Sequence, residues 1–247
     1  MKTDELIKAL VADSATVEPP ISRTVMLSLL TGAMLAAILF AAIMGPRSDF
    51  GWSIVHSPRF IFKFVLTLGL AIPAYFAVQR LARPDATAGR TIWILAMVPL
   101  MLAIGVLVEM YLLPADHWSV YMIGSNSKAC VSLIPLFSLA PLGGALLALR
   151  RGAPSHPTAA GAFAGLLAAG IGATLYASHC VDDSPLFIAV WYTIAVGMIT
   201  GLGAFLGSRL LKGSSCRSTH SVVRFGCPCL AAGLPGMILH FSPRREM

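Results

Sequence analysis

The chain has 247 residues, of which 57% are hydrophobic and only 12% are charged, and its 18 Lys and Arg residues outnumber 11 Asp and Glu residues. A typical soluble domain carries about 45–50% apolar and about 25% charged residues. The composition therefore excludes an ordinary soluble enzyme and a disordered protein, and it predicts a membrane protein.

Residues 1–23 form the polar segment that precedes the first apolar stretch. Thr3 is a good helix N-cap, and Asp4 and Glu5 fall in the first turn, where acidic groups suit the helix dipole. The apolar residues that follow share one helical face: Leu6, Ile7, Leu10 and Val11. A helix this short is marginal alone in water, so this face must pack against something. A protein partner and the chain's own helical bundle both remain open, while the acidic residues disfavour anionic lipid.

Six apolar stretches follow in the chain. A helix needs about 20 apolar residues to cross a hydrocarbon core about 30 Å thick. The stretches of that length are Thr24–Pro46, Phe60–Gln79, Thr91–Val108, Ala129–Leu149, Thr158–Ser178 and Leu186–Ser208. They predict an all-α polytopic domain with six transmembrane helices over residues 24–208. Lys63 is the only charged residue within them, and its place near one end predicts that its ammonium snorkels to the interface.

The basic residues fall unevenly on the two sides of this predicted topology. With a cytoplasmic N-terminus, 14 of the 18 Lys and Arg residues lie inside, and the outer side keeps Arg47, Arg59, Lys63 and Lys128. An excess of Lys and Arg marks cytoplasmic loops. We therefore expect both termini in the cytoplasm, with residues 209–247 as a poorly ordered tail. The net positive charge then requires no direct binding of nucleic acid, and no cofactor is indicated.

Small residues recur four positions apart in the fifth and sixth stretches. Such spacing lets transmembrane helices approach closely. The pairs are Gly161/Gly165, Ala168/Gly172, Gly197/Gly201 and Gly203/Gly207. They predict tight packing between the fifth and sixth helices.

Two of the five cysteines are predicted to lie at the outer face. Cys130 opens the fourth stretch and Cys180 follows the fifth, and a short inner loop makes these helices antiparallel neighbours. Their outer ends are therefore expected to be close, as an interhelical disulfide requires, on the side of a membrane where disulfides persist. A cysteine at a helix end also serves as a small apolar residue, and that alternative stays open.

Candidate metal ligands surround Cys180. His179, Asp182 and Asp183 are its neighbours, and the preceding outer loop carries Asp116 and His117. Thiolate, imidazole and carboxylate together suit a soft or borderline divalent metal. No pair has zinc-finger spacing, so these residues are accessory candidates and no metal is assigned. Ordinary loop polarity is the alternative.

Three further cysteines lie in the tail: Cys216, Cys227 and Cys229. Together with His220 they match no common zinc module. We assign them no role.

Two segments, together with the six spans, resemble the NrsF family of proteobacterial membrane-bound negative regulators of sigma F, an extracytoplasmic-function sigma factor. The first is the opening MKTDELI-x2-L, and the second is HC-x2-DSPLFIAVWY over residues 179–192. The resemblance covers about residues 1–212, and the tail from Gly213 onward departs from the family pattern.

The resemblance implies a regulatory protein of the bacterial inner membrane rather than an enzyme. Its cytoplasmic N-terminus would hold the sigma factor through the residues Asp4, Glu5, Leu6, Ile7, Leu10 and Val11. Cys130 and Cys180 match two outer-side cysteines that would respond to metal or oxidative stress. The sequence does not indicate the oligomeric state.

Other classes of membrane protein fit the sequence less well. A transporter or channel normally has a charged residue at mid-membrane, and none is found in the six stretches. A thiol oxidoreductase usually needs a C-x-x-C pair, whereas the outer cysteines are isolated. No stretch combines the nucleophile and base of an intramembrane protease.

Overall fold

The computed structural model describes residues 21–83, 89–152 and 154–211, and within these ranges it contains helices and turns but no strand. Six helical segments are long and apolar enough to cross a membrane, as predicted. The first five are α2 (Ile21–Ile43), α4 (Pro58–Leu81), α5 (Thr91–Leu112), α7 (Ser127–Arg151) and α8 (Pro157–Ala177). The sixth joins three elements end to end, α9 (Pro185–Phe187), a π-helical turn η2 (Ile188–Tyr192) and α10 (Thr193–Leu210).

All span ends except the start at Thr91 differ from the prediction, by one to four residues, and three of them have a clear local feature. The first span ends at Ile43 instead of Pro46, because Gly45 takes a positive φ of 68° and turns the chain. The second begins earlier, at Pro58, after Ser57 caps it by accepting a hydrogen bond from the Phe60 N–H. The third runs four residues past Val108, to Leu112, which brings Glu109 into α5.

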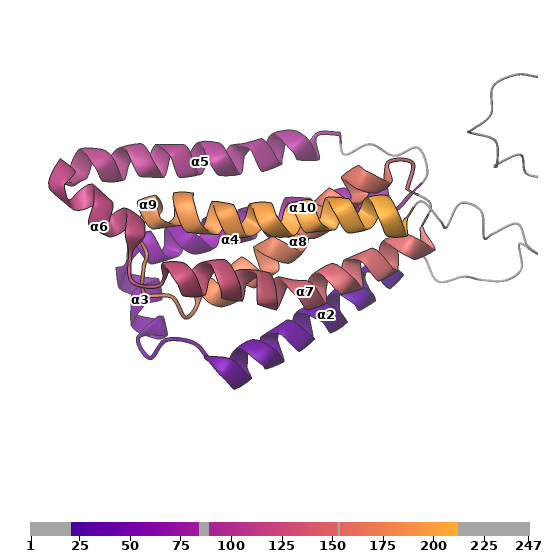
Figure 1. Cartoon of the computed structure of the whole chain (residues 1–247), viewed down its shortest axis with the longest axis horizontal. Coiled ribbons are helices and arrows are strands. Elements are labelled where there is room, and N and C mark those ends of the chain that lie inside the picture. Colours follow the sequence, from indigo (N-terminus) through magenta and orange to yellow (C-terminus); the bar gives the residue numbers. More distant parts are fainter. Residues whose placement is uncertain (1–20, 84–88, 153, 212–247) are drawn as a thin grey trace, which may run out of the picture.

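Helix α8 lies at the centre of the bundle. It packs against α4, α7 and α10, while α2 packs along α7 and α5 contacts mainly α4. Figure 1 shows α2 and α5 along opposite sides of the bundle with the other four helices between them. Helix α5 buries only Thr91 and Glu109. The rest of its apolar surface is exposed, as expected of a helix that faces lipid.

Glycines set the close approach of α8 and α10, as the spacing predicted. A Cβ on Gly161 would lie 2.3 Å from Gly203 O, and one on Gly165 would lie 2.5 Å from Ile199 O. Gly203 and Gly207 face the same contact from α10. The pair Gly197/Gly201 does not contribute, because a Cβ at either position meets nothing within 4 Å. The prediction was therefore right for one pair on α10 and wrong for the other.

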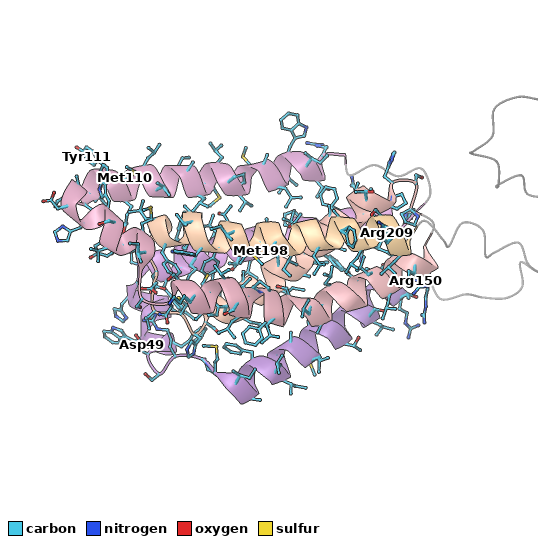
Figure 2. All side chains as sticks on the ribbon, viewed as in Figure 1. Asp49, Met110, Tyr111, Arg150, Met198 and Arg209 are labelled. Atoms are coloured by element: carbon cyan, nitrogen blue, oxygen red, sulfur yellow. The ribbon has the colours of Figure 1, made fainter. Side chains whose placement is uncertain are left out.

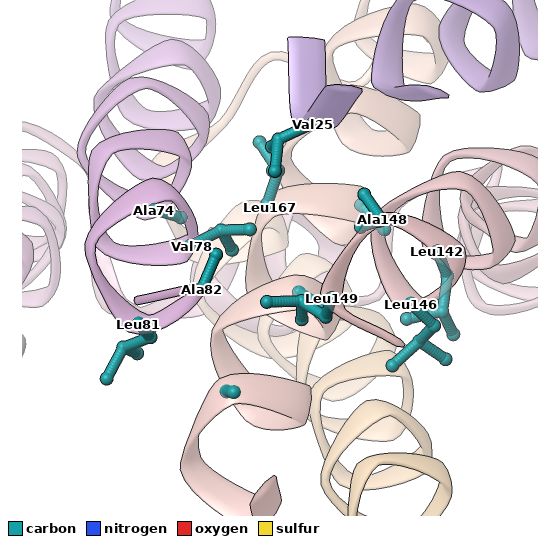
Figure 3. Packing of buried hydrophobic residues seen from close by; sticks show 14 of the residues in the cluster. Val25, Ala74, Val78, Leu81, Ala82, Leu142, Leu146, Ala148, Leu149 and Leu167 are labelled. Carbon is teal, nitrogen blue, oxygen red and sulfur yellow. The ribbon is translucent and has the colours of Figure 1, made fainter. Parts of the chain in front are cut away.

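The core consists of two clusters along the bundle axis. The larger one is built mainly from Ala and Leu side chains, including Ala74, Val78, Leu149 and Leu167 (Figure 3). The second contains both Cys130 and Cys180 together with Tyr176, Phe187 and Tyr192. Large apolar side chains also cover the outer surface of the helices (Figure 2), as expected where the solvent is lipid.

Three connections meet at the end of the bundle that holds the second cluster. They are residues 44–57 with the short helix α3 (Phe50–His56), residues 113–126 with the turn η1 (Ala115–His117) and helix α6 (Trp118–Ile123), and residues 178–184. We call this the cysteine end. Hydrogen bonds join the three connections, for example from Arg47 N–H to Ser178 O at 3.1 Å.

The glycine contacts can be tested with one substitution at two positions. Gly161→Ala is expected to destabilise the protein by about 1–3 kcal/mol, because the new methyl group meets the backbone of α10. Gly197→Ala is the matched control and should leave stability unchanged, since its Cβ enters open space. Melting temperatures of the purified variants in detergent measure the difference, and equal temperatures would contradict the close contact.

Candidate functional site

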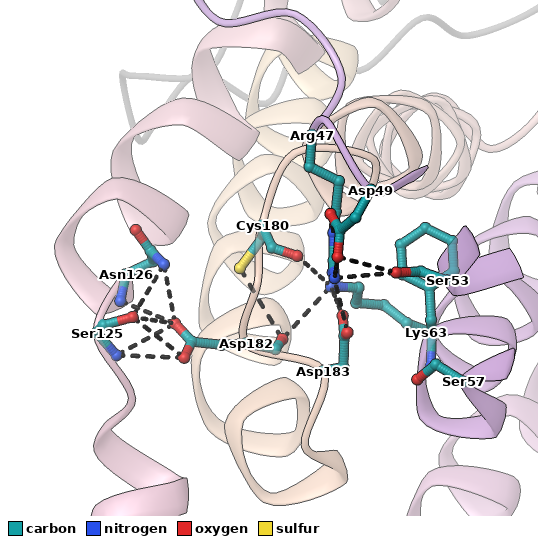
Figure 4. Close-up of polar contacts among 11 residues, drawn as sticks. Arg47, Asp49, Ser53, Ser57, Lys63, Ser125, Asn126, Cys180, Asp182 and Asp183 are labelled. Carbon is teal, nitrogen blue, oxygen red and sulfur yellow. Dashed lines mark hydrogen bonds and ion pairs between the residues drawn. The ribbon is translucent and has the colours of Figure 1, made fainter. Parts of the chain in front are cut away.

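Lys63 is the most deeply buried charge in the described part of the chain. It lies in the second turn of α4, and its side chain is 0% exposed. Its ammonium pairs with Asp183 Oδ1 at 2.5 Å and donates to Cys180 O at 2.9 Å and Asp182 O at 3.4 Å (Figure 4). The predicted snorkelling is therefore wrong. Lys63 points inward because the connection 178–184 supplies a counterion and two carbonyl groups that bind its ammonium.

Asp183 joins two cations. Besides Lys63, it accepts a hydrogen bond from Arg47 Nη1 at 3.1 Å. Arg47 also holds Asp49 through two hydrogen bonds, of 2.5 and 2.6 Å, and donates to Ser53 Oγ at 3.0 Å. The chain of charges therefore runs from the connection 44–57 through the connection 178–184 to α4.

The ion pair between Arg47 and Asp49 depends on pH only under acidic conditions. The hydrogen bonds that Arg47 donates to Asp49 lower the pKa of Asp49 from 3.8 to about 2, and the same bonds raise the pKa of Arg47. Because the folded-state pKa of Asp49 is depressed, the pair stabilises the fold above pH 3.8. That contribution is lost as the pH falls towards 2.

Asp182 fixes the connection 113–126. Its carboxylate accepts the backbone N–H groups of Ser125 and Asn126, at 3.2 and 2.9 Å, and their side chains as well (Figure 4). Asn126 O in turn accepts the Cys130 N–H at 2.8 Å and the Tyr176 hydroxyl at 3.3 Å. Asp182 therefore positions the start of α7, where Cys130 lies.

His179 also joins two of the connections at the cysteine end. Its Nδ1 lies 2.9 Å from Gly45 O. A carbonyl oxygen only accepts hydrogen bonds, so Nδ1 is the protonated nitrogen here. The imidazole thereby ties the connection 178–184 to the turn that ends α2.

Glu109 is a site residue that sequence reasoning missed. It is 4% exposed, pairs with Arg59 Nη2 at 3.1 Å, and accepts a hydrogen bond from Ser184 Oγ at 3.2 Å. Ser184 also caps α9 by accepting the Leu186 N–H. The third stretch was predicted to end at Val108, so Glu109 read as a loop residue. The signal that could have found it is the apolar pattern that continues through Met110–Leu112.

The two cysteines lie together, as the antiparallel arrangement of α7 and α8 predicted. Both thiols are free, with Cys130 0% and Cys180 1% exposed, and they belong to the same core cluster. Burial raises the pKa of the Cys180 thiol above its ordinary value of 9.0, and its S–H contacts Asp182 O at 3.9 Å. In this conformation Cys180 is a protonated, sheltered thiol and not an exposed thiolate nucleophile.

The accessory ligands do not assemble around the thiols. The oxygens of Asp182 and Asp183 and Nδ1 of His179 have the partners given above, and His117 is exposed on η1. Within residues 21–83, 89–152 and 154–211, no group of three or more His, Cys, Asp and Glu side chains could hold a metal ion. The metal-ligand role of these four residues stays a prediction.

A cavity of about 660 Å³ opens beside the connection 178–184. Its lining includes Arg59, Tyr121, Ser125 and the run Val181–Ser184. The guanidinium of Arg59 lies 6.0 Å from the centre of the Tyr121 ring. Residues 181–184 therefore line this cavity, and they directly follow the buried Cys180 in the chain.

Two sets of predicted residues lie outside the described ranges. The first is the N-terminal set Asp4, Glu5, Leu6, Ile7, Leu10 and Val11, and the second is the tail cysteines Cys216, Cys227 and Cys229. The predicted segments 1–23 and 209–247 overlap the described ranges only at residues 21–23 and 209–211.

Comparisons with known proteins agree with the resemblance seen in the sequence. The family model described as "Negative regulator of sigma F" matches residues 10–212. The "Anti-sigma-F factor NrsF" of Caulobacter vibrioides is 33% identical over 215 residues, which cover 86% of this chain and all of that protein. The "Probable anti-sigma-F factor NrsF" of Azospira oryzae is 32% identical over 217 residues, with the same coverage. No solved structure matches.

The shared carboxylate can be tested by removing it. Asp183→Asn is expected to destabilise the protein by about 3–5 kcal/mol, because it leaves the buried Lys63 ammonium without its counterion. Asp49→Asn is the control, since Arg47 keeps Asp183 and Asp49 is 52% exposed. Thermal unfolding in detergent compares the two. A melting temperature for Asp183→Asn as high as that of Asp49→Asn would show that the buried pair carries little stability.

Proposed function

The chain belongs to the family of negative regulators of sigma F, and on that premise we propose that it holds an extracytoplasmic-function sigma factor at the bacterial inner membrane. Six helices able to span a bilayer anchor it there. Family membership over residues 10–212 is the observation that carries the anti-sigma role. A sigma factor held in this way is kept from core RNA polymerase, so the protein acts on transcription without touching DNA.

The proposed orientation places the cysteine end outside and both termini in the cytoplasm. The distribution of Lys and Arg in the sequence supports it. The cysteine end carries only four of the 18 Lys and Arg residues, the smaller share expected of a translocated side: Arg47, Arg59, Lys63 and Lys128.

The sigma factor is proposed to bind residues 1–23. Leu6, Ile7, Leu10 and Val11 supply an apolar helix face, and Asp4 and Glu5 supply charge at its start. An amphipathic helix of this kind binds a partner by laying its apolar face in a groove. Burial of these side chains against the sigma factor would stabilise the helix, which is too short to be stable alone.

Cys130 and Cys180 are the proposed sensor of metal or oxidative stress. With hydrogen peroxide as the oxidant, the two thiols lose two protons and two electrons, one S–S bond forms, and the peroxide is reduced to two water molecules. A soft metal ion bridging the two sulfurs would make an equivalent link, with His117, His179, Asp182 and Asp183 as the candidates for further ligands. Either link exists in only one arrangement of α7 and α8, and it therefore shifts the population between two states of the bundle.

A route from the thiols to the N-terminal segment is available through α7 and α2. Cys130 lies in the first turn of α7, and α2 follows residues 1–20. The two helices touch backbone to backbone, since a Cβ on Gly144 would lie 2.3 Å from Ser28 O and one on Gly32 would lie 2.7 Å from Ala140 O. A displacement of α7 at the cysteine end would therefore move α2 and the segment before it.

The sensor role predicts the behaviour of a double variant. Cys130→Ser with Cys180→Ser should abolish induction of a sigma-dependent reporter by oxidant or soft metal, while repression without stress is retained. Cys216→Ser is the matched control, since no role is assigned to that thiol, and it should be induced like the parent. Normal induction of the double variant would rule out the thiol mechanism.

The N-terminal contact is tested with charges on two faces of the predicted helix. Leu6→Asp with Leu10→Asp should reduce co-purification of the sigma factor with the membrane-bound full chain by at least tenfold, because both substitutions fall on the apolar face. Ala9→Asp with Ala12→Asp adds the same charge to the opposite face and should leave co-purification unchanged. Equal loss in both variants, or in neither, would contradict binding through this face.

A further inference from the structure

The contacts of Lys63 exceed what neutralisation of its charge requires. An ammonium group has three N–H donors, and here it makes an ion pair with Asp183 Oδ1 and hydrogen bonds to Cys180 O and Asp182 O. Only the first is a counterion. Asp183 also has a second cation, Arg47, so Lys63 is not needed to neutralise it. Buried ionisable residues in membrane spans usually have a function.

The two carbonyl groups belong to the backbone that carries Cys180. They flank Val181, which is 58% exposed, so the ammonium holds the chain on both sides of a residue that makes little packing contact of its own. Asp182 O also accepts the Cys180 S–H at 3.9 Å. One oxygen atom therefore receives both the Lys63 ammonium and the thiol.

We propose that Lys63 is a positioning residue that holds the backbone of residues 180–182 so that the Cys180 thiol stays buried beside Cys130. This proposal rests on the proposed function, because the burial of the thiol pair would set the concentration of oxidant or metal at which the sensor responds. Without Lys63, the connection 178–184 keeps its contacts through His179, Asp182 and Asp183 but loses the one that fixes the Cys180 carbonyl. Cys180 then becomes accessible while the bundle stays folded.

The test measures how fast Cys180 reacts with N-ethylmaleimide in the membrane-bound full chain. Serine replaces the other four cysteines, and the mass of the intact protein reports the modification. Lys63→Met should react at least tenfold faster than the parent, because it fills the site without any donor. Lys63→Arg keeps the charge and the donors and should stay within threefold of the parent rate. An unchanged rate for Lys63→Met would overturn the proposal.

Two controls separate positioning from a general loosening of the bundle. The first removes the other ion pair of α4, with Arg59→Met and Glu109→Gln together, and should leave the Cys180 rate within threefold of the parent. The second places Lys63→Met in a chain whose single thiol is Cys130, whose rate should also stay within threefold, since Lys63 bonds to the Cys180 backbone. Acceleration in either control as large as that of Cys180 would overturn the proposal.

Two further measurements keep the result interpretable. If Lys63→Met does not accumulate in membranes, Lys63→Gln takes its place and should also react at least tenfold faster, because one short amide does not reach both carbonyls; a parental rate would overturn the proposal. The labelling needs no sigma factor, so it is independent of the reporter assay. Fast labelling of Lys63→Met together with normal induction of the Cys130→Ser and Cys180→Ser variant would refute the sensor function and leave the positioning role standing.

Discussion

The buried ammonium of Lys63 is the constraint on which the cysteine end depends. Moving a charge out of water costs several kcal/mol, and the cost is recovered only with a well-placed counterion and hydrogen bonds to the remaining donors. All three acceptors of Lys63 come from residues 180–183. The connection 178–184 therefore packs against α4 at the cysteine end, and Asp182, Asp183 and Ser184 reach three different neighbours from one short segment.

This arrangement shelters two thiols that lie in one core cluster. Cys130 and Cys180 are enclosed by Tyr176, Phe187 and Tyr192, and burial disfavours the thiolate that oxidants and metals require. The residues after Cys180 face a cavity of about 660 Å³. Access to Cys180 is thus controlled by a segment held by hydrogen bonds and ion pairs, and these depend on geometry more steeply than apolar packing does.

The sequence was sufficient to predict the membrane-spanning helices but not the contacts between charged residues that lie far apart in the chain. Six spans and the neighbouring cysteines follow from apolar length and from antiparallel helices joined by a short loop, both of which are local properties. Gly161 and Gly203 were correctly predicted to pack, but the same spacing at Gly197 and Gly201 faces open space, because spacing does not say which face of a helix has a neighbour. Lys63 was misread and Glu109 was missed, since their partners, Asp183 and Ser184, lie 120 and 75 residues away.

The packing also determines which helices move together. In lipid no hydrophobic force drives helices against one another, so close backbone contact and hydrogen bonds hold them. Helix α2 has such contacts with α7 through Gly32 and Gly144, whereas α5 is held near the cysteine end by Glu109 and exposes most of its length. Helix α7, which carries Cys130, therefore has close backbone contacts with α2 and also with α8, where a Cβ on Gly172 would lie 2.8 Å from Ile134 O. In the proposed sensor, a change at the thiols would pass from α7 to α2, which directly follows residues 1–20, without requiring α5.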